Sequence, residues 1–175
     1  MPAVGGLRPT ADALRETLFN WLQPRLPGAR VLDLFAGTGA LGLEAASRGA
    51  DTVLLVERDA RAAAQLEANC DTLGAGQVRV RRDDALRVLA DPPPEGRPYD
   101  LVLVDPPFHK GLVAPVLAAL RASGWLHPDS CVYVEIEAEA DLGFLAADGW
   151  RVERERQGGQ ARALLLAQAE PDATD

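Results

Sequence analysis

The chain has 175 residues, 47% of them hydrophobic and 25% charged, which is enough apolar content for the core of one domain. Its formal net charge of −8 argues against binding nucleic acid over the whole surface. No apolar run approaches the roughly 18 residues of a membrane span, and the first residues lack the apolar segment of a signal peptide. We therefore expect a cytoplasmic protein with no membrane partner. The two cysteines match no metal-ligand spacing.

The N-terminal segment predicts a helix. Apolar residues recur at helical spacing between Ala13 and Leu22, and Thr10 is expected to cap the helix. Pro27-Gly28 then ends the segment. Unlike the chain as a whole, this region is locally basic, with Arg8, Arg15, Arg25 and Arg30.

The stretch VLDLFAGTGALG, residues 31–42, is the centre of the sequence. Residues 31–35 predict a buried parallel strand, because they are apolar without alternation apart from Asp33. A glycine turn over 37–39 and a helix over 43–48 follow. Strand, glycine turn and helix begin the nucleotide-binding α/β folds, in which glycines permit a tight turn and close approach to a ligand. The next strand, 52–56, ends in Glu57, at the spacing of a carboxylate that accepts from two ribose hydroxyls.

Sites for NAD and for S-adenosylmethionine (SAM) share these parts. Asp33 favours SAM, because a dinucleotide places a pyrophosphate at the glycine turn, where a nearby carboxylate would repel it. SAM has no phosphate, and it carries an ammonium and a sulfonium group. A Rossmann-like domain without a cofactor is the remaining alternative.

The rest of the chain alternates between strand and helix. We predict helices over 60–73, 85–89, 111–122 and 140–147, and strands over 78–80, 99–104, 131–136, 150–156 and 162–167. The last two strands form a hairpin with Gly158-Gly159 at its turn. The pattern predicts an α/β fold: a mostly parallel seven-stranded sheet, helices on both faces and an antiparallel C-terminal hairpin strand at the edge. Ligands should bind at the carboxyl ends of the strands, where Gly37, Glu57, Asp84 and Asp105 fall.

Asp105-Pro106-Pro107-Phe108 is the most specific chemical motif of the sequence. Each proline fixes φ and removes an N–H donor, so the segment presents acceptors. The Asp105 carboxylate and the Pro106 carbonyl suit an NH₂ group, which can donate both hydrogens while its lone pair is aimed, and the Phe108 ring can stack on a planar base. D/N-P-P-Y/F/W is the motif of SAM-dependent amino-methyltransferases. A Pro-Pro turn that merely ends a strand is the alternative.

Six stretches together carry a resemblance to a known family: LRPTADALRETLFNWL (7–22), LDLFAGTGALGLEAASRGA (32–50), VERD (56–59), LEANC (66–70), RRDDAL (81–86) and DLVLVDPPF (100–108). Over nearly all of residues 7–168 the chain resembles the bacterial small-subunit ribosomal RNA guanine-N2 methyltransferases. Members usually begin with a longer basic segment, whereas only MPAVGG precedes Leu7 here. This departure affects the expected RNA affinity more than the fold or SAM binding.

The resemblance implies a Rossmann-like class I methyltransferase in one domain, residues 1–170, with a substrate-side helix within 7–28 and a core over 29–168. We expect the acidic tail, 169–175, to be disordered. The implied reaction methylates the exocyclic N2 amine of a guanine, with SAM as cofactor, S-adenosylhomocysteine as product and no metal. The implied partner of a monomeric enzyme is small-subunit ribosomal RNA or the assembled small subunit.

The resemblance also implies roles for single residues. The cofactor is expected to contact Asp33, Phe35, Ala36, Gly37, Thr38, Gly39, Glu57, Arg58, Asp84, Ala85 and Asp105. Glu57 would accept from the ribose, Asp84 or alternatively Asp83 from the adenine amine, and Asp33 would handle the amino-acid end through water. The expected catalytic residues are Asp105, Pro106, Pro107 and Phe108. The substrate is expected to contact Arg8, Thr10, Arg15, Phe108 and Lys110.

An RNA enzyme with an acidic surface must concentrate its cations, so we expect Arg8, Arg15, Arg25 and Lys110 on one face around the site. Two alternative functions remain. The same amine-binding motif could act on DNA adenine or on protein glutamine, although a DNA enzyme usually needs an added recognition domain. The chain could also be a SAM- or RNA-binding module without activity, against which the intact acceptor motif argues.

Overall fold

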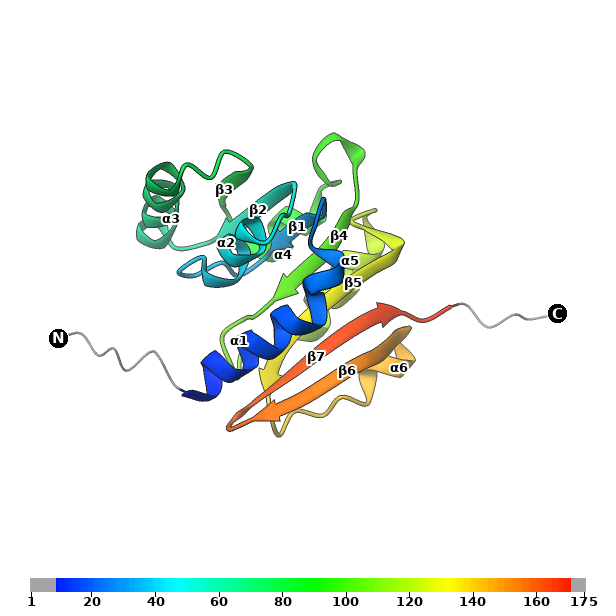
Figure 1. The fold of residues 1–175 in the computed structure, drawn as a ribbon. Helices are drawn as coiled ribbons and strands as arrows, with labels where there is room; N and C mark the ends of the chain where they lie inside the picture. Colours follow the sequence, from blue (N-terminus) through cyan, green and yellow to red (C-terminus); the bar gives the residue numbers. More distant parts are fainter. Residues whose placement is uncertain (1–8, 171–175) are drawn as a thin grey trace.

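The computed structural model describes residues 9–170, with side chains from residue 12 onward (Figure 1). Its helices are α1 (Pro9–Leu22), α2 (Ala40–Ser47), α3 (Ala60–Leu73), α4 (Ala85–Ala90), α5 (Val113–Ala122) and α6 (Phe144–Ala147), with short 3-10 turns η2 (Gln23–Arg25) and η3 (Pro94–Gly96). Its strands are β1 (Arg30–Asp33), β2 (Thr52–Glu57), β3 (Val78–Arg82), β4 (Tyr99–Val104), β5 (Leu126–Glu137), β6 (Trp150–Gly158) and β7 (Ala161–Gln168).

The seven strands form one sheet in the order β3-β2-β1-β4-β5-β7-β6. Every pair from β3 to β5 is parallel, and β7 runs antiparallel to both β5 and β6. The mostly parallel seven-stranded sheet with an antiparallel C-terminal strand is therefore confirmed. Within the hairpin, β7 is inserted between β5 and β6, so β6 forms the edge of the sheet and pairs antiparallel with β7. Burial explains the order: residues 163–166 of β7 are buried, whereas β6 carries exposed charged residues that suit a sheet edge.

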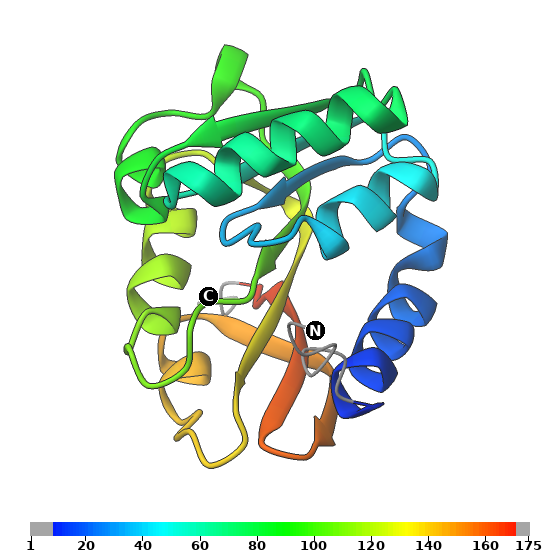
Figure 2. The ribbon, with the colours of Figure 1, turned by 90° about the vertical axis from the view of Figure 1, so that its left-hand side faces the viewer.

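Both faces of the sheet are covered, as predicted. Adjacent residues of a strand belong to opposite cores: Val31 belongs to the core that contains residues of α1, α2 and α3, whereas Leu32 belongs to the core that contains residues of α4, α5 and α6. Figure 2 shows α1 and α2 on one side of the sheet and α5 on the other. The continuous apolar runs of the parallel strands follow from this burial on both faces.

Helix α1 packs on the sheet beside the antiparallel strands β6 and β7. Arg156 of β6 donates to Thr17 of α1 over 2.7 Å, which ties the helix to the edge strand. α1 begins at the end of the sheet where β5 finishes and where the hairpin turns (Figures 1 and 2). The N-terminal helix therefore starts at the same end of the sheet as the carboxyl ends of the parallel strands.

Several predicted boundaries differ from the structure. Thr10 is the second residue of α1 and not its cap, because the helix begins at Pro9, whose fixed φ suits a first helical position. The helix expected over 140–147 is shorter and begins at Phe144, as α6. The residues before it form a turn, in which the Asp141 carboxylate accepts from the Gly143 N–H at 2.9 Å. Strand β5 begins at Leu126, five residues before the predicted start at residue 131. The hairpin turns at Gly159-Gln160, one residue later than predicted.

In the described part of the chain, none of the helices combines the length and the apolar character needed to cross a membrane.

Candidate active site

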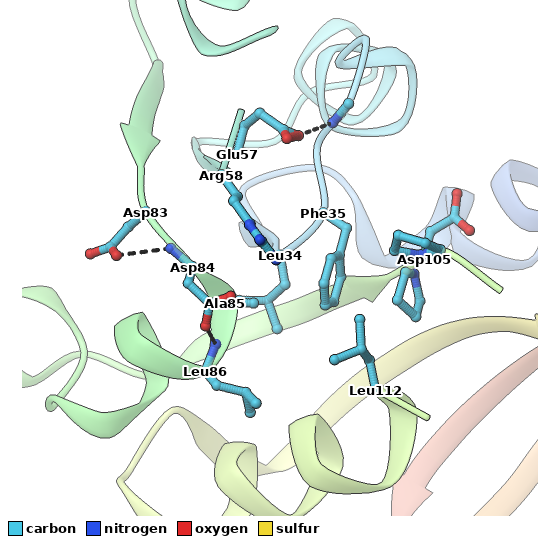
Figure 3. A pocket seen from close by; sticks show the side chains of 13 residues that line it. Leu34, Phe35, Glu57, Arg58, Asp83, Asp84, Ala85, Leu86, Asp105 and Leu112 are labelled. Atoms are coloured by element: carbon cyan, nitrogen blue, oxygen red, sulfur yellow. Dashed lines mark hydrogen bonds between the residues drawn. The ribbon is translucent and has the colours of Figure 1, made fainter. Parts of the chain in front are cut away.

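A cavity of about 390 Å³ opens at the carboxyl ends of β1, β2, β3 and β4 (Figure 3). This volume lies within the usual range for small-molecule sites, roughly 300–1,000 Å³. Its walls combine apolar side chains with carboxylates: Leu34, Phe35, Gly37, Glu57, Arg58, Asp83, Asp84, Ala85, Leu86, Asp105, Pro106, Pro107 and Leu112. The site therefore lies where the strand pattern predicted it.

The glycine turn between β1 and α2 forms one side of the cavity. Gly37 has φ +55°, and a Cβ there would meet no atom within 4 Å, so this backbone is open to a ligand. Gly39 and Gly42 serve packing instead. A Cβ would come within 2.6 Å of Leu66 at Gly39 and within 2.2 Å of Leu55 at Gly42. These two glycines let α2 lie close to α3 and β2.

Asp33 lies beneath this turn and is only 1% exposed. Its carboxyl accepts from the Phe35 N–H at 3.3 Å and from the Gly42 backbone. Burial raises its pKa to about 7, an effect that the two backbone hydrogen bonds oppose. The structure does not bring Asp33 to the cavity wall. Two backbone N–H groups bind this buried carboxyl, so we expect Asp33 to act on the site by holding the turn.

Glu57, at the end of β2, reaches across to the glycine turn (Figure 3). Its Oε2 accepts from the Gly37 N–H at 2.8 Å, and its Oε1 accepts from the Asp59 N–H at 3.2 Å. Each carboxylate oxygen has a further lone pair, which leaves capacity for ligand hydroxyls. Glu57 therefore both fixes the turn and presents acceptors beside the cavity.

Asp83 and Asp84 follow β3 and form the opposite wall. Asp84 caps α4, because its Oδ1 accepts from the Leu86 N–H at 3.0 Å and the Arg87 N–H at 3.3 Å. Asp83 accepts from the Asp84 N–H at 2.8 Å and lies 3.3 Å from the Arg81 guanidinium. All hydrogen bonds described for the Asp84 carboxylate fall on Oδ1, so Oδ2 remains as an acceptor.

The Asp105–Phe108 segment leaves β4 at the floor of the site. Asp105, Pro106 and Pro107 line the cavity, while Phe108 lines a second, adjoining cavity of about 220 Å³. His109 has φ +62°, which is strained for a residue with a side chain, and its N–H donates to Glu137 at 3.4 Å. The loop after the motif is therefore held back against β5.

Asp105 lies beside a second carboxyl that the sequence interpretation missed. β4 and β5 pair with Val104 opposite Val134, which places Asp105 next to Glu135. Burial and the hydrogen-bonded Glu135 carboxyl raise the pKa of Asp105 well above its ordinary value. The Tyr133 hydroxyl donates to Glu135 Oε1 at 3.4 Å. Burial and the neighbouring carboxyl therefore favour the protonated form of Asp105.

The structure brings most of the predicted site residues together. The cavity wall contains Phe35, Gly37, Glu57, Arg58, Asp84, Ala85, Asp105, Pro106 and Pro107 of the predicted set. Asp33, Ala36, Thr38 and Gly39 do not line it. The sequence interpretation missed Leu34, Leu86, Leu112 and Glu135. Glu135 could have been found, because it is a polar residue near the end of a buried strand, as Asp105 is.

The predicted substrate residues are less concentrated. Arg8 lies outside the described residues, and Thr10 is described only by its backbone in α1. Arg15 is exposed and lies 3.3 Å from Asp12, and Lys110 is exposed in the loop after the motif. Arg25 contradicts the expected basic face. It donates to the Asp129 carbonyl near the beginning of β5 and pairs with Glu153 at 3.6 Å, far from where β5 ends at the site.

Among residues 9–170, no group of three or more His, Cys, Asp or Glu side chains has the arrangement of a metal site. The strand order, the glycine turn and the cavity at the strand ends define a Rossmann-like methyltransferase fold. The chain belongs to the family described as Conserved hypothetical protein 95, whose model matches residues 1–167.

Curated relatives and a solved structure agree with this assignment. The chain is 45% identical to Ribosomal RNA small subunit methyltransferase D of Escherichia coli strain K12, over 99% of the chain and 87% of that protein. It is 40% identical to the protein of the same name from Haemophilus influenzae, over 88% of the chain and 79% of that protein. The solved structure of yhhF from Escherichia coli superimposes with a TM-score of 0.83 and 42% identity, covering 94% of this chain and 89% of that one. The family resemblance seen in the sequence is confirmed.

Proposed function

We propose that this protein uses SAM to methylate the exocyclic N2 amine of a guanine in small-subunit ribosomal RNA. One observation carries the proposal: a nucleotide-sized cavity and an amine-accepting motif meet. Pro106, Pro107 and Leu112 line both the cavity at the strand ends and the smaller cavity beside Phe108. A cofactor in the first space and a base in the second would therefore adjoin across the motif.

The residues of the larger cavity fit SAM. Glu57 offers acceptors for ribose hydroxyls, Asp84 Oδ2 offers one for the adenine amine, and Leu34, Phe35, Leu86 and Leu112 provide apolar walls for the adenine ring. The carboxylates favour a cationic ligand without phosphate. When bound, SAM supplies a methyl group made electrophilic by its sulfonium sulfur.

The motif residues then act on the amine. Asp105 and the Pro106 carbonyl would accept the two N2 hydrogens, which orients the nitrogen lone pair, and Phe108 would stack on the guanine ring. As the new N–C bond forms and the C–S bond breaks, the amine loses one proton. Asp105 can take it when its carboxyl is ionised, because burial makes that carboxylate a stronger base than an exposed one, and water takes it when Asp105 is already protonated. Positioning is expected to supply most of the rate enhancement.

The choice of substrate rests on the family. The two curated relatives are named as methyltransferases of small-subunit ribosomal RNA, and this chain covers most of their length. The N2 amine as the target rests on the Asp105–Phe108 motif and on the resemblance seen in the sequence. The two adjoining cavities suit direct transfer from the cofactor to an amine.

Transfer of tritiated methyl groups tests the proposal. The full-length protein would be offered naked small-subunit RNA, assembled small subunits, DNA and total protein, each with tritiated SAM. We expect label only in the RNA of one or both ribosomal samples. Label in DNA or protein, or in none of the four, would contradict the proposed substrate.

A further inference from the structure

The smaller cavity has a distinctive wall. Its volume is about 220 Å³, Phe108 and Phe144 contribute aromatic rings to its wall, and Ile136 and Val113 add aliphatic side chains. The polar side chains at its wall are His109, Glu135, Glu137 and Asp141. Three of these four are carboxyls, so the wall favours a ligand that donates hydrogen bonds and disfavours a phosphate.

Two of the three carboxyls are engaged by loop backbone. Glu137 Oε2 accepts from the His109 N–H at 3.4 Å, and Asp141 Oδ1 accepts from the Gly143 N–H at 2.9 Å. These contacts shape the loops on either side of the cavity. Glu135 differs, because its partners are the Tyr133 hydroxyl at 3.4 Å and the neighbouring Asp105.

Glu135 and Asp105 are adjacent across two parallel strands. The pairing of Val104 with Val134 fixes their relative register, and both residues follow buried strand positions. Rigid strands hold functional groups more accurately than loops do. The site therefore presents two neighbouring carboxyls, one at the wall of each cavity, on either side of the Pro106-Pro107 segment that the cavities share.

Among the bases, guanine alone matches two adjacent acceptors. Its N2 amine lies next to N1–H, so its edge presents donors side by side. Adenine and cytosine each place a ring nitrogen lone pair next to the amine instead, and that lone pair would face a carboxyl oxygen. A buried acceptor left without its donor is costly, so such sites discriminate strongly.

We propose that Glu135 determines the base specificity of the enzyme by accepting the N1–H of the target guanine, while Asp105 accepts from the N2 amine. This inference rests on the proposed function and adds to it the residue that rejects other amine-bearing bases. The Tyr133 hydroxyl orients Glu135 by donating to its Oε1.

An RNA that keeps the amine but lacks N1–H tests the inference. Small-subunit RNA would be ligated from a synthetic oligonucleotide carrying 2-aminopurine at the nucleotide that the wild-type protein methylates in ordinary RNA. This base retains the amine, replaces N1–H with a lone pair and carries hydrogen in place of O6, so the Glu135 variant below separates the effect of N1 from that of O6. We expect the wild type to have a kcat/KM at least tenfold lower on 2-aminopurine RNA than on guanine RNA.

A variant at Glu135 tests whether this residue requires a hydrogen-bond donor at N1 of the base. Glu135→Gln offers an amide NH₂ that can donate to the lone pair of 2-aminopurine, so the preference for guanine should fall at least tenfold relative to the wild type. Glu139→Gln is the matched control, because Glu139 is exposed and lines neither cavity. It should keep the wild-type preference.

The two kinds of failure are distinguishable. No methylation of guanine RNA by the wild type would overturn the proposed function and this inference with it. Normal methylation of guanine RNA together with equal use of 2-aminopurine RNA would overturn the inference alone, whether or not Glu135→Gln folds. An unchanged preference in a folded Glu135→Gln that binds SAM normally would also overturn it.

Discussion

At the scale of single residues, the carboxyl of Asp33 at the end of β1 and that of Asp105 just after β4 have different roles. Asp33 is satisfied by the backbone of the turn that follows it, whereas Asp105 shares its site with Glu135. The sequence showed that Asp33 needed a partner, because a buried carboxyl is costly. It did not show whether that partner was a ligand or the protein's own backbone, because this depends on where the turn places its N–H groups.

Asp33 should make stability depend on pH. Burial raises its pKa from 3.8 to about 7 in the folded protein, so its contribution to stability is fully present below the unfolded value and is lost as the pH rises through the folded one. The free energy of unfolding should therefore fall between about pH 4 and pH 7, by at most about 4 kcal/mol from this group. An asparagine side chain keeps an acceptor without the charge. In Asp33→Asn, the free energy of unfolding measured with urea at each pH should therefore fall less between about pH 4 and pH 7 than in the wild type. A decline as steep as in the wild type would contradict this role.

Glu57 should contribute to cofactor affinity. Glu57→Ala removes the acceptors expected for the ribose and the hydrogen bonds that hold Gly37 and Asp59. Hydrogen bonds to a charged group contribute about 1.5–3 kcal/mol, so calorimetry should show SAM binding weakened about ten- to a hundredfold. Glu67→Ala, exposed on α3, is the control and should bind as the wild type does. Unchanged affinity in Glu57→Ala would remove Glu57 from the cofactor site.

At the scale of elements, the strands and helices were largely predictable, because apolar runs and helical spacing report burial directly. What the sequence could not separate was the purpose of each glycine in the turn. Gly37 faces open space, whereas Gly42 packs against β2. The two glycines cannot be told apart in the sequence, because only the neighbouring elements show which glycine leaves room for a ligand and which allows close packing.

Gly42→Ala should therefore destabilise the fold. The new Cβ would lie 2.2 Å from Leu55 Cδ2 and 3.4 Å from the Asp33 carboxyl, so the buried Leu55 side chain, α2 or β2 must shift. Overpacking of this kind costs about 1–3 kcal/mol, which corresponds to a Tm lower by about 2–12 °C for a protein of this size. Gly76→Ala is the matched control, since a Cβ there meets nothing within 4 Å and its φ is not left-handed. Equal melting temperatures for the two variants would refute the packing role.

At the scale of the whole molecule, the order of the strands and the placement of charge were the least predictable features. The position of β7 inside the sheet depends on its burial against both β5 and β6 and not on its local pattern. Arg25 is close to Arg15 in sequence, but α1 carries it to the other end of the sheet. The basic face expected around the site is therefore smaller than the sequence indicated.

Arg15 should still contribute to RNA binding, since α1 begins at the end of the sheet that carries the site (Figure 1). Arg15→Glu should weaken RNA binding and make log K less steeply dependent on log salt, by about one in slope, while SAM affinity stays constant. Arg97→Glu is the matched control, because it changes the net charge equally but lies before the start of β4, away from the site. If both variants change the slope equally, a local basic contact at Arg15 is excluded.

The atom that receives the methyl group distinguishes the proposed enzyme from the alternatives. The most direct measurement is mass spectrometry of nucleosides from small-subunit RNA after reaction with SAM and the full-length protein. We expect N2-methylguanosine from the wild type and none from Asp105→Ala, which should still fold and bind SAM, because Asp105 is proposed to bind the amine. A methyl group on adenosine or cytidine, or N2-methylguanosine at the wild-type rate from Asp105→Ala, would contradict the proposed reaction.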